Sequence, residues 1–347
     1  MKADRLRNPP QRRSPTALRR AAEGESARTI VIALLANIVI AIAKLIAGLA
    51  SRSTGMLAEA AHSTADSVNE VFLAIGLRRD RKPADARHPM GHGRERFLWA
   101  FMAAIASFLI GGCVSIAMGV AELRARHPVS GGLAAWIVLA VSFAADGISW
   151  RQSMRQARRQ AGEYGIDVWR YLKRSSDPVV RAIVIEDSAA LVGLALAAAG
   201  LLLSEILGTN VPDSIASLLI GILLAITAFG VARPLADFLV GQSLPQEQYD
   251  QLYAIVSVDA AIEEVVSLRA MYTGPEEVLV VAKIRPSPKW ESAQLAKAMD
   301  ELDHIIRTAF PIVADVFIDV TTHHSEKVPA SEQKEPETIS TDDRRQS

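Results

Sequence analysis

A histidine and an aspartate stand four residues apart inside a largely apolar stretch, GMLAEAAHSTADSVNEVFLAIG. On an α-helix, His62 and Asp66 project from one face one turn apart, so an imidazole nitrogen and a carboxylate oxygen could bind one divalent cation. Glu59, one turn before His62, and Asn69, three residues after Asp66, extend the polar stripe and are predicted to orient these ligands. A hydrogen-bonded His–Asp pair at a helix contact is the alternative. Depth within an apolar segment favours the metal site, because ionisable groups are costly there.

A second apolar stretch that contains acidic residues is AIVIEDSAALVGLALAAAG. Glu186 and Asp187 are adjacent, so on a helix they point about 100° apart and only one of them can face His62 directly. A metal cation bound jointly by this stretch and by the stretch with His62 would neutralise the negative charge of both acids. Ion pairing between helices is the alternative, and Lys44 is the cationic partner that the apolar segments offer. Asp146 is a further acid in an apolar segment, either a proton-relay group or a partner of Lys44, and we favour the pairing.

The stretch ADARHPMGHGRERF holds a third group of possible ligands. Asp85, His88 and His92 are spaced three and four residues apart, and together they offer two nitrogens and one oxygen. Two histidines in a loop carry little information by themselves. The proline and glycines of this stretch allow the backbone to turn the three side chains toward one another, which favours a compact loop site.

The elements that carry these residues are long apolar segments. Six of them reach the roughly 20 residues that suffice to cross a bilayer: 29–50, 56–77, 97–123, 132–150, 179–204 and 213–240. Buried helices of a large soluble protein are the alternative, which six such lengths in succession disfavour. A hydrophobic content of 50% and a mean hydropathy of +0.19 with 22% charged residues suit a chain that is part membrane and part aqueous.

Charge and cysteine content exclude several classes of protein. The 38 basic residues balance the 38 acidic ones, so no nucleic-acid partner is expected. The single cysteine, Cys113, excludes a disulfide framework and a cysteine-based zinc cluster. The absence of a His-Glu-x-x-His sequence argues against a membrane metalloprotease, and no enzymatic activity or cofactor is predicted.

Basic residues predict the topology of the bundle. Eight precede the first segment, seven lie between the second and third, and seven lie between the fourth and fifth, whereas the alternate connections hold only Arg52, Arg124 and Arg126. The positive-inside rule therefore places both termini in the cytoplasm. An Arg-rich transit peptide is the alternative reading of the N-terminal arm, and the acids Asp4, Glu23 and Glu25 count against it.

After Gly241 the amino-acid composition becomes typical of a water-soluble domain. Helical and alternating patterns predict the order helix, strand, strand, helix, strand, at 246–256, 263–272, 276–284, 291–308 and 315–320. The predicted fold class is thus an all-α six-helix transmembrane bundle followed by a small cytoplasmic α+β domain with its helices on one face of a three-stranded sheet. The expected parts are a basic arm (1–28), the transmembrane domain (29–243), the α+β domain (244–324) and a disordered tail (325–347).

Four stretches resemble, in order, parts of the cation diffusion facilitator family of divalent-metal transporters. AEAAHSTADSVNE resembles the family's second-helix metal motif, and DARHPMGHGRERF is similar to its loop motif with a Gly-His-Gly core. PDSIASLLIGILL resembles the start of its sixth helix, and the C-terminal unit has the size and order of its cytoplasmic dimerisation domain. The resemblance covers about residues 29–320. SSDPVVRAIVIEDSAALVG further resembles the zinc transporter nine branch, in which a Glu-Asp pair stands in the fifth helix.

Carried over by position, the resemblance implies a transport site and a loop site. Their ligands would be His62, Asp66 and Asp187 in the first, and Asp85, His88 and His92 in the second. The better-known zinc branches carry another ligand one turn before the last aspartate, where this chain has Ile183. Glu186 is the candidate fourth ligand instead. One histidine with two or three carboxylates suits Zn²⁺ and also Mn²⁺ or Fe²⁺.

The predicted function is export of a divalent cation, Zn²⁺ first, from the cytoplasm. A cation held by carboxylates and neutral imidazole is displaced when protons titrate those groups, so exchange for protons is expected. The resemblance implies the same proton-coupled export and a homodimer. The protein is expected to be an integral membrane protein of the bacterial inner membrane. A membrane-embedded metal sensor or structural partner that binds the ion without turnover is the alternative function.

Overall fold

The computed structural model describes residues 34–35, 37–125, 132–163, 167–168, 178–275 and 277–322. The chain divides into two compact units, Met1–Gly241 and Gln242–Ser347. The predicted basic arm and the predicted disordered tail lie outside the described residues.

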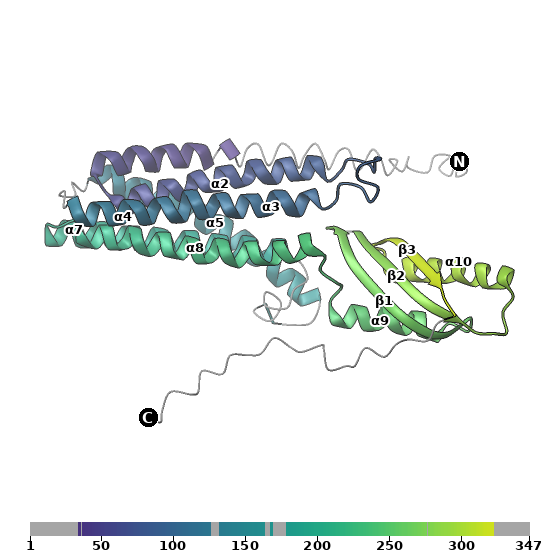
Figure 1. Ribbon diagram of the computed structural model, residues 1–347. Coiled ribbons are helices and arrows are strands. Elements are labelled where there is room, and N and C mark those ends of the chain that lie inside the picture. Colours follow the sequence, from purple (N-terminus) through teal and green to yellow (C-terminus); the bar gives the residue numbers. More distant parts are fainter. Residues whose placement is uncertain are drawn as a thin grey trace, which may run out of the picture. The chain divides into compact units, whose positions relative to one another are not determined.

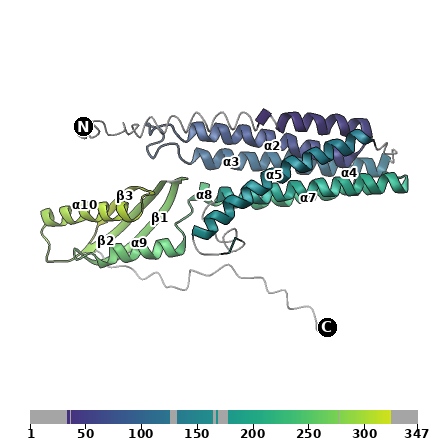
Figure 2. The ribbon, with the colours of Figure 1, turned by 180° about the vertical axis from the view of Figure 1, so that it is seen from behind.

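The first unit is made of helices that run side by side (Figures 1 and 2). A first helix covers Asn37–Ser51. It is followed by α2 (Thr54–Arg79), α3 (Glu95–Ala106), the π-helical turn η1 (Ser107–Cys113), α4 (Val114–Ala125), α5 (Leu133–Glu163), α7 (Pro178–Leu207) and α8 (Val211–Val240). Because α3, η1 and α4 follow one another without a break, they form one long helix with a π-helical insertion.

Four helices among the described residues are long and apolar enough to cross a membrane: Glu95–Ala125, Leu133–Arg159, Val184–Leu207 and Val211–Val240. They coincide with the third to sixth segments expected from the sequence. The first helix is shorter within its described part. The helix α2 has 26 residues, about 39 Å at 1.5 Å per residue, but its acids and polar residues lower its mean hydropathy.

Small residues let the helices approach closely at the centre of this unit. A Cβ atom added to Gly221 of α8 would lie 2.6 Å from Ile116 Cγ1 and 2.9 Å from the Gly112 carbonyl oxygen, and one added to Gly200 of α7 would lie 2.6 Å from Ala216 Cβ. Such close backbone approach replaces hydrophobic burial as the source of packing energy between helices in lipid.

A buried carboxylate of α8 holds the beginning of α2. Asp213 accepts hydrogen bonds from Ser53 Oγ (2.7 Å), Thr54 Oγ1 (2.9 Å), Gly55 N (3.1 Å) and Thr54 N. Its side chain is fully buried. The first N–H groups of a helix have no partner within the helix, and an anion there is favoured by the helix dipole. Asp213 therefore caps α2 and ties its first turn to α8.

The second unit has the element order expected from the sequence: α9 (Gln246–Val258), β1 (Ile262–Gly274), β2 (Glu277–Pro286), α10 (Ser292–Ala309) and β3 (Val313–Val320). The strand order is β1-β2-β3, with β1 antiparallel and β3 parallel to the central β2. A parallel neighbour needs a crossover, which α10 supplies. The face of β2 with Val278, Val280, Ala282 and Ile284 is fully buried, as its alternating pattern predicts.

Candidate metal centre

His62 and Asp66 lie together in the interior of the first unit. Two turns of α2 separate His62 from the helix start that Asp213 holds. His62 Nδ1 is 3.7 Å from Asp66 Oδ1, and the His62 side chain is buried. Among the described residues, both ring nitrogens of His62 and the Oδ1 atom of Asp66 are buried without a hydrogen-bond partner. Buried polar atoms nearly always have a partner, so this pair has open positions for a ligand.

Glu59 is engaged by a cation from the neighbouring helix. Lys44 Nζ lies 3.0 Å from Glu59 Oε2 and 2.9 Å from Ser63 Oγ, and all three side chains are buried. Asp146 Oδ2 of α5 is 3.9 Å from the same ammonium. The pairing of Asp146 with Lys44 that the sequence favoured is therefore seen, and Glu59 serves as the main partner of that lysine.

The two acids of α7 face different helices. Glu186 Oε1 accepts a hydrogen bond of 3.0 Å from Asn69 Nδ2 of α2. Asp187 instead accepts hydrogen bonds from two serines of α5, Ser149 (3.2 Å) and Ser153 (2.7 Å). In this arrangement Glu186 is the α7 acid turned toward α2.

One further acid, Glu70, lies in this interior and was not predicted from the sequence as a site residue. Glu70 follows Asp66 by one turn of α2, and its Oε1 atom accepts a hydrogen bond of 2.8 Å from Asn37 Nδ2. Its Oε2 atom is buried without a hydrogen-bond partner among the described residues. The four-residue spacing from His62 to Asp66 continues to Glu70, so the same stripe could have identified it.

Asp85, His88 and His92 come together in the loop between α2 and α3. One possible ligand atom from each lies within 4.8 Å of the others. Asp85 Oδ1 is 3.2 Å from His88 Nδ1, Asp85 Oδ2 is 3.2 Å from His92 Nε2, and the two imidazole ring centres are 4.2 Å apart. Gly91 adopts a φ of 78°, a left-handed conformation that glycine tolerates and that reverses the chain between the histidines.

Hydrogen bonds set the charge of this loop cluster. The backbone N–H of His88, the His92 side chain and the backbone N–H of Arg87 hold the pKa of Asp85 well below its ordinary value. Glu95, with Oε1 at 2.9 Å from His92 Nδ1, and Asp85 raise the pKa of His92. A carboxylate on the far nitrogen of a metal-binding histidine is a common arrangement, because it orients the ring and increases its basicity.

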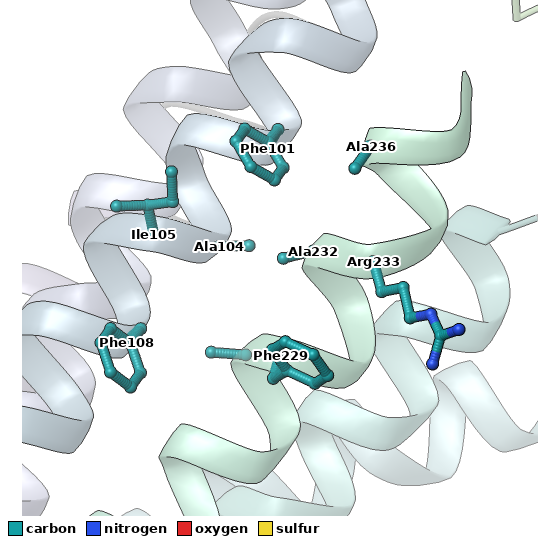
Figure 3. Close-up of a pocket in the computed structure, with 9 residues that line it drawn as sticks. Phe101, Ala104, Ile105, Phe108, Phe229, Ala232, Arg233 and Ala236 are labelled. Carbon is teal, nitrogen blue, oxygen red and sulfur yellow. The ribbon is translucent and has the colours of Figure 1, made fainter. Parts of the chain in front are cut away.

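A groove of about 450 Å³ lies between α8 and the helix formed by α3 and η1, and it offers no group of metal ligands. Phe101, Ile105 and Phe108 line one side and Phe229 and Ala232 the other, with Arg233 as its one charged residue (Figure 3). A cation has no oxygen or imidazole ligand among these side chains, so the groove does not compete with the two acid and histidine groups as a metal site.

The fold and the buried ligand atoms define a helical membrane protein with a polar, acid-rich interior. Residues 30–240 match the family model described as the cation efflux transmembrane domain. The chain belongs to the cation efflux family, the cation diffusion facilitators that its motifs resemble, and the resemblance is thereby confirmed.

Known relatives include transporters of different metals. Metal tolerance protein C4 of Arabidopsis thaliana is 29% identical over 75% of this chain and 57% of its own length. The human mitochondrial proton-coupled zinc antiporter SLC30A9 is 27% identical over 74% of this chain and 45% of its own length. The manganese efflux system protein MneP of Bacillus subtilis is 23% identical over 87% of this chain and 97% of its own length. The chain thus spans about half the length of the first two.

Proposed function

We propose that this protein is a secondary transporter that exports a divalent metal cation from the cytoplasm in exchange for protons. The observation that carries the proposal is the buried imidazole of His62, whose two nitrogens have no described hydrogen-bond partner, next to Asp66. Zn²⁺ is the first candidate, supported by the relatives named as zinc antiporters. Mn²⁺ and Fe²⁺ remain alternatives, because the relative MneP is named for manganese efflux and a carboxylate-rich site suits both ions.

The proposed ligands of the transported ion are His62, Asp66 and an acid of α7. Glu186 is supported as that acid by its hydrogen bond to Asn69 of α2. Asp187, which the family motif implies, is held by serines of α5 and would need to rotate to reach the ion. Both acids therefore enter the proposal, Glu186 in the arrangement described here and Asp187 in another state of the transport cycle.

Proton coupling follows from the same ligands. A metal ion requires neutral imidazole and ionised carboxylates, so protons that bind these groups from an acidic compartment displace the ion on that side. The return of the empty site then carries protons inward. This competition needs no other group than the metal ligands themselves.

The wider arrangement is proposed on the resemblance and on the charge pattern. Six transmembrane helices would include the helix Asn37–Ser51 and α2, whose polar residues face the bundle interior. Basic loops support cytoplasmic termini in a bacterial inner membrane. The bundle would extend over residues 29–243, and the α+β domain, 244–324, would mediate a homodimer.

The loop cluster Asp85, His88 and His92 is proposed as a second, cytoplasmic metal site. Its support is the convergence of three possible ligand atoms within 4.8 Å and the contact of His92 with Glu95. An ion there would be a resident or regulatory metal, separate from the transported one.

The test is metal uptake into proteoliposomes under an imposed pH gradient. His62→Ala and Asp66→Ala should abolish metal-driven proton flux, whereas Thr64→Ala should not, because Thr64 is an exposed residue of the same helix that bonds only its own backbone at Ala60. Wild-type flux in the first two variants would refute the site. Metal binding without any flux in the unmutated protein would instead favour the sensor.

Comparison of Glu186→Gln with Asp187→Asn separates the two α7 acids. If the described arrangement is the metal-binding one, Glu186→Gln should weaken metal binding more than Asp187→Asn. The reverse order would show that Asp187 turns inward when the metal binds.

A further inference from the structure

Lys44 is a buried cation that the transport scheme above does not use. It lies on the helix Asn37–Ser51 and is the one buried side chain among the lysines and arginines whose burial the structure describes. Burial of an ammonium group is strongly unfavourable unless acceptors replace the lost water. A lysine in such a place inside a membrane protein is therefore expected to have a function.

The partners of Lys44 within the described part of the chain leave one of its hydrogen-bond donors unused. An ammonium has three N–H donors. Glu59 Oε2 at 3.0 Å and Ser63 Oγ at 2.9 Å accept two of them. Asp146 Oδ2, at 3.9 Å, lies within ion-pair distance but beyond hydrogen-bond distance. Lys44 thus links α2 to α5 through one tight and one loose contact with an acid.

This cation adjoins the proposed transport site. Ser63, which accepts a hydrogen bond from Lys44, directly follows His62 in the sequence. Glu59, the main partner of Lys44, precedes His62 by one turn of α2, so the ammonium lies beside the turns of α2 that carry the site. A metal ion bound by His62 and Asp66 would therefore experience the positive charge of Lys44.

We propose that Lys44 is a tethered counter-cation, which compensates the interior acids when no metal is bound and opposes the divalent ion when it arrives. Its positive charge weakens binding at the transport site and so allows the ion to leave. In this scheme Lys44 does not contact the metal. It acts through the electric field that its positive charge produces at the site. The inference rests on the proposed transport function.

The size of the effect follows from Coulomb's law. In surroundings of effective dielectric about 20, a unit charge repels a divalent ion at an assumed separation of about 10 Å enough to lower affinity by about two orders of magnitude. Glu59 offsets part of this repulsion because it is ion-paired with Lys44. We therefore expect removal of the Lys44 charge to tighten metal binding by at least about tenfold.

The experiment measures Zn²⁺ dissociation constants of the purified full-length protein by competition with a chromophoric chelator. The relevant binding is the component that His62→Ala abolishes. Lys44→Met should lower its Kd by about tenfold or more and slow uptake into proteoliposomes, because release becomes slower. Lys44→Arg, which keeps the charge, should bind Zn²⁺ like the unmutated protein. An unchanged or weaker affinity in folded Lys44→Met overturns the inference.

A second comparison holds even if Lys44→Met fails to fold with Glu59 unpaired. Glu59→Gln removes that anion, and Lys44→Met/Glu59→Gln then removes the cation in a background without an uncompensated carboxylate. The double variant should bind Zn²⁺ about tenfold or more tightly than Glu59→Gln. Equal or weaker binding would show that Lys44 only braces the helices.

The outcome for His62→Ala separates this inference from the proposed function. If His62→Ala leaves all Zn²⁺ binding intact, the transport site is wrong and the role of Lys44 falls with it. If His62→Ala abolishes the component but both Lys44 comparisons show no tightening, the transport site stands and only the role of Lys44 is wrong.

Discussion

Replacement of Asp213 tests whether α8 determines the position of the helix that carries His62 and Asp66. Asp213→Ala removes the acceptor of four hydrogen bonds from the start of α2. Asp213→Asn keeps the shape and one acceptor oxygen but replaces the other oxygen with a donor. Glu205→Gln, on an exposed acid of α7 that accepts one hydrogen bond from Trp136, is the matched control.

The magnitude follows from the groups that lose their acceptor. The hydroxyls of Ser53 and Thr54 can rotate toward other oxygens, but the backbone N–H groups of Thr54 and Gly55 are buried and fixed. A buried donor left without a partner costs about 1–3 kcal/mol, so the two together cost about 2–6 kcal/mol. Asp213→Asn should cost less, about 0.5–1.5 kcal/mol, because both N–H groups bond the same oxygen, Oδ2, which the amide oxygen can replace. Glu205→Gln should change stability by about 0.5 kcal/mol or less.

Thermal unfolding of the purified protein in detergent, followed by tryptophan fluorescence, measures these differences. For a unit of this size about 2–4 °C of Tm corresponds to 1 kcal/mol, so Asp213→Ala should lower Tm by roughly 4–24 °C. Zn²⁺ binding should also weaken, because His62 lies two turns from the released helix start. If Asp213→Ala unfolds within 1 °C of Glu205→Gln, the carboxylate does not hold α2 and the reasoning is wrong.

Three further predictions concern packing and the loop. Gly221→Ala should destabilise the bundle by about 1–3 kcal/mol, because its Cβ would meet backbone atoms of the α3–α4 helix within 3 Å, while Gly230→Ala, with open space around it, should be neutral or stabilising in the same Tm measurement. Ile284→Ala should lower the opening free energy of β2 by about 2–5 kcal/mol, whereas Val281→Ala on the exposed face should change it by about 1 kcal/mol or less; hydrogen exchange of 277–286 distinguishes them, and equal exchange rates would contradict the assigned faces. His92→Ala should remove one bound Zn²⁺ per chain at equilibrium dialysis and leave the His62-dependent component in place; an unchanged stoichiometry would show that the loop cluster holds no metal.

The membrane segments and the fold of the C-terminal unit were accessible from the sequence because their signals are local. A run of apolar residues predicts a buried or membrane helix wherever it lies, and the alternation from Val278 to Ile284 predicts one buried face of a strand. The loop cluster was accessible for the same reason. Asp85, His88 and His92 lie within eight residues, so the turn chemistry between them decides their proximity.

The hydrogen-bond and ion-pair partners of the buried charged residues were harder to predict from the sequence. Glu59 was predicted to orient the ligands of α2, yet it is bound to Lys44. Asn69 was also predicted to orient ligands, and the ligand candidate to which it donates lies on α7, Glu186. Each of these contacts depends on the rotation of one helix about its axis relative to another, and spacing within a single helix carries no information about that rotation.

Sequence alone therefore determined which residues are polar inside apolar segments, and that His62 and Asp66 share a helix face, since both properties follow from composition and a period of 3.6 residues. Only the tertiary structure decided that Glu186 turns to α2 while Asp187 turns to α5. It alone also showed that Asp213, 159 residues away, binds the start of α2. The physical reason is that helix rotation and long-range hydrogen bonds result from the packing of all helices at once, which no local pattern encodes.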